Sequence, residues 1–452
     1  MILGSKKAAL GLLLGDAAAF VVSLWITLLL RYGEVPSRAT ILDHAEPFAL
    51  LFAAWLIVFY LSGLYSKRIL LFKSRLPDAL MKTQAFNIAL AAVFFFLVPV
   101  FGIAPKTVLI IYLVVSLAVI FLWRLAIHPK ITARGARLSA ALIASGAEAD
   151  ELAHEVNGNA RYGIRFTYVR KPEDLDDPAR FARELSEAGV SLLVVDTDQV
   201  KSVDILPVLY RLGRLERRYQ LAEFENVYEE VFDRIPLSRL EYEWFLRNVS
   251  PANTIVYAAM KRLIDIAGGI LMGVVTAIAV PFVWAALQIE SPGSLFVRQE
   301  RLGERGAPVR AYKFRSMRFS DGGMWPGEGA NTVTRVGGFL RRTSLDEFPQ
   351  FMSVISGELS LIGPRNDLQA LGKRLAEAIP YYDARYLVKP GITGWAQINQ
   401  QYEPGAISPS SIEETKMRLA YDFYYLKNRS LGLDLVIALK TLKRMFFRVS
   451  SW

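Results

Sequence analysis

The chain of 452 residues contains no cysteine and only three histidines. The absence of cysteine excludes disulfide frameworks, thiolate nucleophiles and cysteine-ligated zinc. The histidines are His44, His128 and His154, so the remaining two thirds of the chain must carry out any chemistry without imidazole. Carboxylates and hard metal ions are the groups left for catalysis there.

Charge is also scarce. Charged residues make up 21% of the chain and apolar residues 53%, against about 25% charged residues in an ordinary soluble domain. A wholly soluble enzyme is therefore not expected. Lys and Arg exceed Asp and Glu by 53 to 43, and a basic, apolar chain favours anionic lipid or phosphorylated substrates over nucleic acid. The length predicts roughly three structural units.

Long apolar runs are present, and a bilayer core of about 30 Å requires around 20 apolar residues in a helix. Four runs meet this requirement. A signal peptide is not expected at the first run, because its apolar stretch is too long for one and three more runs follow. They predict four transmembrane helices within residues 1–128: Ala8 to Leu30, Pro47 to Leu64, Ala85 to Ala104 and Thr107 to Trp123.

The distribution of Lys and Arg predicts the topology. Lys6 and Lys7 precede the first span, a group that includes Lys67 and Lys82 lies between the second and third, and Arg124 follows the fourth. Because cytoplasmic loops are enriched in these residues, the N-terminus and everything after residue 128 are expected in the cytoplasm. Asp16 lies within the first span, where it either has a functional role or pairs with another polar side chain between the helices.

Residues 138–250 alternate short apolar runs with amphipathic stretches. Leu138 to Gly146 predicts a strand and a turn, Ala147 to Asn157 a helix, and Arg165 to Val169 and Ser191 to Val195 two more strands. This alternation predicts a Rossmann-like α/β domain with a parallel sheet. Dinucleotide binding requires three glycines at the first turn, and only Gly146 is present. The domain is thus degenerate, and either an accessory or dimerising role or a retained nucleotide site is open.

Asp196 and Asp198 follow a predicted strand of this domain. Two carboxylates at this spacing can share a divalent cation that holds a diphosphate, as in many nucleotide-sugar glycosyltransferases. Aspartate at a strand end also serves as a turn former or helix cap. Both interpretations are open from the sequence.

Leu263 to Ile289 is long and apolar enough to span a membrane, but basic residues flank both of its ends. A helix that enters the membrane and returns keeps both flanks in the cytoplasm, and Pro281 provides the break. We therefore expect a re-entrant helix over residues 263–289, with Lys261 and Arg262 at the lipid headgroups. An ordinary fifth span with a kink is the alternative.

The segment Arg341 to Gln350 combines charge with a helix signal. Ser344 and Glu347 have the spacing of a capping box, in which Asp346 and Glu347 merely complement a helix dipole. Alternatively, Arg341 and Arg342 at a helix start form an anion site, where one carboxylate attacks phosphorus while the other holds Mg²⁺.

Other segments with basic, glycine or proline residues also indicate phosphate binding. They include Lys313 with Arg315, Gly363-Pro-Arg365, and Lys389 to Trp395, and they favour phosphate binding at a membrane surface. The last 20 residues, 433–452, have one basic and one apolar helical face. This pattern is typical of a helix in the plane of the membrane surface or of one packed on protein.

In these motifs the sequence resembles the bacterial sugar transferase family, the polyprenyl-phosphate hexose-1-phosphate transferases that begin exopolysaccharide and O-antigen synthesis. The resemblance covers residues 255–452, and four spans with a degenerate Rossmann-like domain resemble the family's large members. The matching motifs are Lys261 to Asp265, Lys313 to Met317, Thr343 to Gln350, Leu361 to Arg365 and Lys389 to Gln397.

The resemblance implies a mainly α catalytic domain anchored by the re-entrant helix, in a bacterial inner membrane. It also implies that Asp346 attacks a UDP-sugar to form a phosphosugar-aspartate and release UMP, and that polyprenyl (undecaprenyl) phosphate then accepts the phosphosugar. Glu347 would hold the Mg²⁺ cofactor, and Arg365, Lys313 and Arg315, with Arg301, would bind phosphates.

The chain departs from the family pattern at Asn366, where the family commonly has proline, and at Ala330 and Thr332, where it has aspartate and arginine. Two other functions remain open: direct glycosyl transfer at Asp196 and Asp198, and an inactive membrane scaffold. The sugar cannot be read from the sequence, although glucose or galactose is the family-level expectation. A homodimer through the α/β domain is a further hypothesis.

Overall fold

The structure is a computed structural model that divides into two compact units, residues 1–231 and 232–452. It describes residues 3–62, 64–65, 76–98, 106–127, 137–159, 162–175, 177–200, 205–216, 218–249, 255–318, 333–400, 409 and 411–449. Ala330 and Thr332, two of the departures from the family pattern, lie outside these residues.

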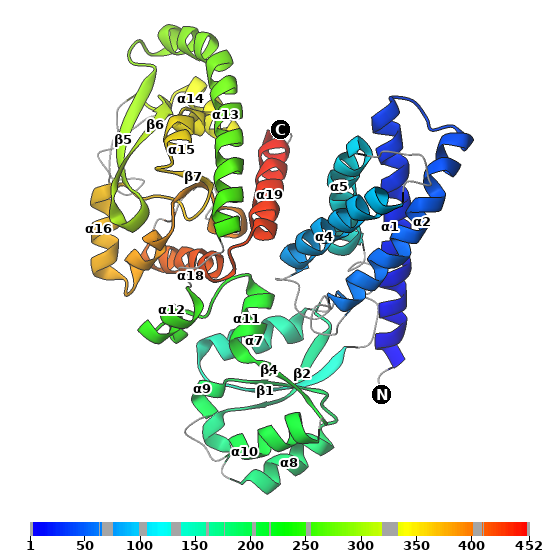
Figure 1. The fold of residues 1–452 in the computed structure, drawn as a ribbon. Helices are drawn as coiled ribbons and strands as arrows, with labels where there is room; N and C mark the ends of the chain where they lie inside the picture. Colours follow the sequence, from blue (N-terminus) through cyan, green and yellow to red (C-terminus); the bar gives the residue numbers. More distant parts are fainter. Residues whose placement is uncertain are drawn as a thin grey trace. The chain divides into compact units, whose positions relative to one another are not determined.

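The first unit begins with four long apolar helices (Figure 1). Helix α1 packs against α2 and α5, and α4 packs against the same two helices. All four are long and apolar enough to cross a membrane, which confirms helices at the four predicted runs. Their bounds are α1 Leu3–Tyr32, α2 Arg38–Leu61, α4 Leu76–Leu97 and α5 Lys106–Phe121, which continues as the π-helical turn η2, Leu122–Ile127.

Asp16 is fully buried among these helices and pairs with a basic residue. Arg124 donates from Nε to Asp16 Oδ1 over 3.0 Å and from Nη2 to Oδ2 over 2.5 Å. The Tyr65 hydroxyl donates to the same carboxylate over 2.8 Å. A buried charge is tolerated in such surroundings when it is paired and hydrogen-bonded. Of the two interpretations of Asp16, the structure confirms the pairing.

The rest of the first unit is a four-stranded parallel sheet in the order β2-β1-β3-β4. Figure 1 shows α7 and α11 on one face of the sheet and α8 and α10 on the other. The predicted strands and first helix are confirmed, whereas β4 was not predicted. The elements are β1 Leu138–Ile143, α7 Ala147–Gly158, β2 Ile164–Arg170, α8 Pro178–Glu187, β3 Leu192–Val195, α9 Thr197–Val200, α10 Leu206–Tyr210, η4 Arg211–Leu215, β4 Gln220–Glu223 and α11 Phe224–Phe232, with the short η3 Pro172–Asp174.

The second unit is mostly helical and contains two small sheets. Strands β5 and β6 form an antiparallel hairpin, and β7 and β8 pair in parallel. Its elements are η5 Leu237–Arg239, α12 Tyr242–Asn248, α13 Ile255–Glu290, β5 Phe296–Leu302, η6 Glu304–Gly306, β6 Pro308–Phe314, α14 Arg335–Thr343, η7 Leu345–Gln350, α15 Phe351–Ser356, β7 Ser360–Ile362, α16 Gln369–Ala378, η8 Tyr382–Leu387, β8 Gly391–Thr393, α17 Trp395–Asn399, α18 Ile412–Asn428 and α19 Leu431–Val449.

Helix α13 is a fifth helix with the length and hydropathy of a membrane span. Figure 1 shows it changing direction sharply before β5. Pro281 lies inside the helix, and proline is the usual cause of such a bend because it removes a backbone donor. Glycine lets the first part of this helix approach β7 closely, because a Cβ at Gly268 would overlap the Leu361 side chain.

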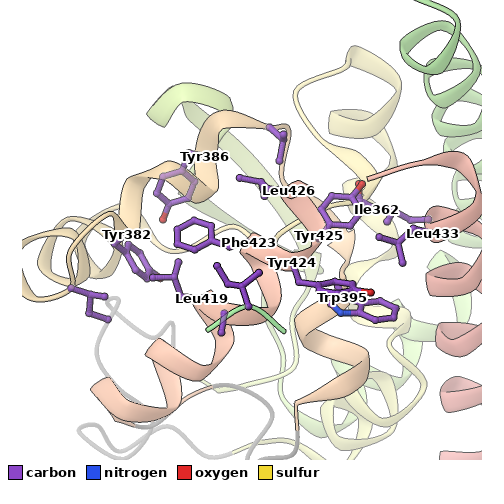
Figure 2. Close-up of a cluster of buried hydrophobic side chains, with 14 of the residues drawn as sticks. Ile362, Tyr382, Tyr386, Trp395, Leu419, Phe423, Tyr424, Tyr425, Leu426 and Leu433 are labelled. Atoms are coloured by element: carbon purple, nitrogen blue, oxygen red, sulfur yellow. The ribbon is translucent and has the colours of Figure 1, made fainter. Parts of the chain in front are cut away.

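The main core of the second unit surrounds α18 (Figure 2). The ring of Trp395 stacks on that of Tyr424 at 5.4 Å. Ile235 and Trp244, which precede α13, are buried in the same core. Residues 232–249 therefore belong with the second unit, whereas the sequence placed the α/β domain as far as residue 250. Their apolar side chains pack on α18, a contact that the chain order does not reveal.

Candidate active site

Two adjacent acids, Asp346 and Glu347, lie on the short 3₁₀ helix η7. The residue before this helix, Ser344, has φ of 57° and ends α14 in the left-handed conformation. Its side chain makes no capping hydrogen bond. The predicted capping box is therefore wrong: α14 ends here rather than a new α-helix beginning, and the Glu347 side chain reaches other partners.

Glu347 lies between two cations. Lys313 Nζ, on β6, donates to Glu347 Oε1 over 2.6 Å, and Arg365 donates from Nη2 to Oε1 over 2.5 Å and from Nη1 to Oε2 over 3.2 Å. Burial alone would raise the pKa of Glu347, but the charges of Arg365 and then Lys313 outweigh burial and hold it well below its usual range. Glu347 is therefore ionised at neutral pH. Burial lowers the pKa of Lys313 to about 8, although the Glu347 carboxylate opposes this.

Asp346 has different surroundings from its neighbour. The residue is 8% exposed, and no described residue donates a hydrogen bond to its carboxylate. Burial, followed by the negative charge of Glu347, raises its pKa, while Lys313, Arg365 and Arg341 oppose this. A carboxylate with free lone pairs beside several cations is suited to nucleophilic attack on an anionic substrate, because its own oxygens are not engaged and the cations offset repulsion.

Arg365 follows strand β7 in the segment Gly363 to Asp367. The next residue, Asn366, receives two hydrogen bonds from Arg301 Nη1, at its backbone oxygen over 2.9 Å and at Oδ1 over 3.1 Å. The proline common in the family would lack the second acceptor. The departure at Asn366 therefore adds a contact that ties the β5 strand to this segment, and Arg301 is used in holding it.

The remaining predicted basic residues are not all brought to the acids. Arg341 donates to the Ser316 hydroxyl over 3.0 Å, and its charge acts on Asp346. Arg342 is exposed and donates to the Gly338 carbonyl on its own helix.

Arg315 is buried and donates to the carbonyls of Ser291 and Pro292. Phosphate binding by Arg315 and Arg342 stays a prediction that their present contacts do not support.

The two cations at the start of α13 have protein partners. Lys261 Nζ lies 3.0 Å from Asp434 Oδ2 and 3.0 Å from the Ile362 carbonyl oxygen. Arg262 donates to the carbonyls of Val354 and Ile355 over 2.8 and 2.5 Å. Contact of these cations with lipid headgroups stays a prediction, while their hydrogen bonds fasten α13 to α15 and β7.

The donor set at η7 fits a magnesium ion that substrate would help to bind. Mg²⁺ in phosphate-transfer sites is usually held by one or two carboxylates together with substrate phosphates and waters. Asp346 and Glu347 provide such a pair, and no group of three or more acidic or histidine side chains that could hold a metal occurs among the described residues. A complete cage made by protein alone is thus not found in that part of the chain.

The second acidic pair is built differently. Asp196 is 2% exposed, and its Oδ1 accepts the Gln199 backbone N–H over 3.2 Å, as a helix cap does. The Gln199 side chain accepts from Ser145 N over 2.8 Å and donates to Ser145 O over 3.1 Å, across the ends of β1 and β3. Ligands of open parallel sheets bind where the strand order reverses, which is between these two strands. Here a side chain of the protein lies at that position.

Four residues of the second unit were missed by sequence reasoning. Asp367, Arg385, Arg418 and Asp422 form a buried ionic cluster behind Arg365. Arg418 and Asp422 are four residues apart on α18, a spacing that predicts an ion pair on a helix surface. That spacing was the available signal, although it does not predict burial.

Comparison with known proteins gives a consistent result. The sequence profile described as "Bacterial sugar transferase" matches residues 256–448. One similar protein is the UDP-N-acetylgalactosamine-undecaprenyl-phosphate N-acetylgalactosaminephosphotransferase of Aeromonas hydrophila. It is 36% identical to this chain over 191 residues, which cover 42% of this chain and 44% of that protein. Another is the UDP-glucose:undecaprenyl-phosphate glucose-1-phosphate transferase of Caulobacter vibrioides. It is 35% identical to this chain over 199 residues, which cover 43% of this chain and 73% of that protein.

A longer match extends beyond the second unit. The undecaprenyl-phosphate glucose phosphotransferase of Komagataeibacter xylinus is 29% identical over 344 residues, which cover 71% of this chain and 61% of that protein. The chain thus spans less than half of the Aeromonas protein but most of the Caulobacter protein. The chain belongs to the bacterial sugar transferase family.

Proposed function

We propose that this protein transfers a sugar-1-phosphate from a UDP-sugar to undecaprenyl phosphate. In the first step an Asp346 carboxylate oxygen attacks the β-phosphorus of the donor. The phosphoanhydride bond breaks, and UMP leaves with the bridging oxygen. In the second step a phosphate oxygen of undecaprenyl phosphate attacks the same phosphorus, the acyl-phosphate bond breaks, and the Asp346 carboxylate is restored.

The contacts at η7 support a division of labour between the two acids. Asp346 accepts no hydrogen bond from a described residue, so its lone pairs are available for attack. Glu347 is held ionised by Arg365 and Lys313. The same two cations, with Arg341, whose charge acts on Asp346, would stabilise the charge that develops on the phosphoryl oxygens. No histidine is needed, because an ionised carboxylate attacks without a general base.

A magnesium ion is part of this proposal. Glu347, with Asp346 beside it, would provide carboxylate oxygens for Mg²⁺. The donor diphosphate and water molecules would supply the remaining ligands. When bound, Mg²⁺ supplies charge stabilisation at the diphosphate. On this proposal Glu347 would exchange part of its contact with Lys313 or Arg365 for the ion, and the released donors of those side chains would bind phosphate oxygens.

The proposed setting is the cytoplasmic face of the bacterial inner membrane, with four transmembrane helices in a bundle and α13 as a re-entrant anchor. A straight helix of this length would extend about 54 Å. However, Arg262 near one end contacts α15, and Leu287 and Glu290 near the other end contact β6 and α14 of the same compact unit. Both ends of α13 thus contact the same compact unit, which supports a helix that enters the membrane and returns to its own side.

Direct glycosyl transfer at Asp196 and Asp198 is the alternative with less support, because Asp196 caps its own chain and Gln199 lies at the end of the sheet.

We propose that the α/β segment is a degenerate Rossmann-like accessory domain. The proposed dimer through this domain has no observation in its favour, and glucose or galactose as the sugar rests on the family alone.

The observation that carries the proposal is the contrast between Asp346, whose carboxylate accepts no hydrogen bond from the described residues, and the doubly paired Glu347. The test is incubation of the purified full chain with Mg²⁺, radiolabelled UDP-glucose or UDP-galactose and undecaprenyl phosphate, with the lipid and nucleotide products identified together. Labelled lipid with UMP supports the proposal. UDP as the sole nucleotide product, or no transfer from any of a wider panel of UDP-sugars, would contradict it.

A further inference from the structure

The buried ionic cluster behind Arg365 lies outside the residues that the proposed reaction uses. Arg385 on η8 pairs with Asp367 and, over 2.6 Å, with Asp422, while Arg418 pairs with Asp367 over 3.2 Å. The Tyr382 and Tyr386 hydroxyls donate to Asp367 over 2.8 and 2.7 Å. Figure 2 shows these two tyrosines on one side of the aromatic cluster, next to Phe423.

Burying the four charged side chains of this cluster has a large desolvation cost. The side chains of Arg385 and Asp422 are 1% exposed, and the other two members are below 10%. Removing four charges from water costs so much that well-packed apolar residues often give equal or greater stability. Burial alone would raise the pKa of Asp367, but Arg385 and then Arg418 hold it well below its usual range. Stability by itself therefore gives no sufficient reason for such a cluster.

The two arginines converge on one backbone atom. Arg385 Nη2 donates to the Arg365 carbonyl oxygen over 2.8 Å, and Arg418 Nη2 donates to the same oxygen over 2.7 Å. The guanidinium of Arg365 in turn binds both oxygens of Glu347. The cluster is thus joined to the acids of η7 through a single residue.

The neighbouring backbone groups of this segment are bonded as well. Gly363 N donates to Thr393 O, Gly391 N donates to Pro364 O, and Leu302 N donates to Asp367 O, each over 2.9 Å. The Asn366 carbonyl accepts from Arg301. Every residue from 363 to 367 therefore has a backbone hydrogen bond, and at Arg365 the carbonyl bond comes from the buried cluster.

We propose that Arg385 and Arg418, held in place by Asp367 and Asp422, are positioning residues that aim the Arg365 guanidinium at Glu347 and at the donor phosphates. This rests on the proposed function, because it assigns the cluster to the same reaction. The arginines act through the backbone of Arg365 and do not touch substrate. A misplacement of about 1 Å in such a group can cost about 100-fold in rate.

The test is a double-mutant cycle in the full chain. Arg418→Lys keeps the charge beside Asp367 but loses the forked donor that reaches Arg365. We expect it to lower kcat about 100-fold in the wild-type background and less than about 3-fold in an Arg365→Lys background, because there is then no guanidinium to aim. Equal losses in both backgrounds would overturn the proposal, since a purely structural role predicts them.

Two further variants guard against misfolding. Tyr386→Phe removes one hydroxyl from Asp367 without changing charge, and a smaller loss of kcat that again vanishes beside Arg365→Lys is expected. Arg137→Lys is the matched control, because Arg137 also donates to two backbone carbonyls, those of Val156 and Asn157, far along the chain from this segment. Its kcat should equal that of the wild type.

Amide hydrogen exchange at residues 363–367 separates this proposal from the proposed function, because it needs no turnover. Faster exchange in Arg418→Lys, with no change in Arg137→Lys, supports the positioning role even if no UDP-sugar proves to be a substrate. Unchanged exchange in Arg418→Lys overturns the role even if the wild-type protein transfers phosphosugar.

Discussion

The two acidic pairs of this chain, Asp196 with Asp198 and Asp346 with Glu347, carry similar sequence signals and have opposite surroundings. At the sheet end, Asp196 caps its own chain, and the Gln199 side chain bonds to Ser145 across the strand ends. At η7, cations from two other elements bind Glu347 and leave Asp346 without a hydrogen bond from any described residue. We propose that Asp346 is the reactive carboxylate, because the described residues leave its oxygens without a hydrogen bond.

The largest effect should come from Asp346. Asp346→Asn removes the proposed nucleophile, so transfer of labelled phosphosugar to undecaprenyl phosphate should fall at least about 10⁴-fold. Asp383→Asn, which changes an exposed aspartate of the same unit, should retain wild-type activity. Turnover by Asp346→Asn within 10-fold of the wild type would show that the nucleophile is another residue. The difference proposed between the two acidic pairs would then be wrong.

Glu347→Gln should have the next largest effect. The substitution leaves Lys313 and Arg365 beside a neutral amide, so kcat should fall about 10²- to 10³-fold, and the Mg²⁺ concentration needed for half-maximal rate should rise. Glu358→Gln, at an exposed glutamate, is the matched control for the loss of one charge. An unchanged Mg²⁺ requirement in Glu347→Gln would exclude it as a metal ligand.

Substitutions at the sheet end should affect stability rather than rate. Asp196→Ala removes a buried cap and should lower the free energy of unfolding by about 1 kcal/mol, while kcat stays within about 2-fold of the wild type. Asp198→Asn should leave both quantities nearly unchanged. Thermal unfolding in detergent and the transfer assay measure the two effects. A loss of more than 10-fold in kcat with either variant would make the sheet end part of the active site.

The smallest effect is expected at Glu223, which accepts hydrogen bonds from the Thr197 N–H and hydroxyl, both over 3.0 Å. Burial, with Asp196 and Asp198 as lesser causes, raises its pKa. Because the raised pKa disfavours the charged form in the folded protein, stability should increase as the pH falls through it. Glu223→Gln should therefore raise the melting temperature at pH 7 by about 1 to 2 °C and flatten that pH dependence. A lower melting temperature would contradict this.

Local patterns in the sequence predicted much of the fold. Apolar runs located the four N-terminal helices, and alternating elements located β1 to β3, because both signals come from consecutive residues. The sequence also located Asp346 and Glu347 through a short motif. It assigned the wrong local structure to them, because capping-box spacing at Ser344 does not reveal that Ser344 adopts the left-handed conformation.

Contacts between distant residues account for what the sequence did not show. Arg315 and Arg365 are both basic residues of segments that the sequence assigned to phosphate binding, yet Arg315 donates to the carbonyls after α13 whereas Arg365 binds Glu347. Arg385 and Arg418 were not singled out, because an arginine is ordinarily expected at the surface. Their burial depends on Asp367 and Asp422, which only the folded chain brings together.

The central claim, that Asp346 becomes covalently bound to the phosphosugar, can be tested by one measurement. The full chain is incubated with Mg²⁺ and a UDP-sugar substrate in the absence of undecaprenyl phosphate, quenched in acid, digested and analysed by peptide mass spectrometry. A hexose phosphate on the peptide that contains Asp346, lost when undecaprenyl phosphate is added before quenching, is the predicted result. Full transfer activity with no such adduct at any time point, or an adduct on another residue, would contradict it.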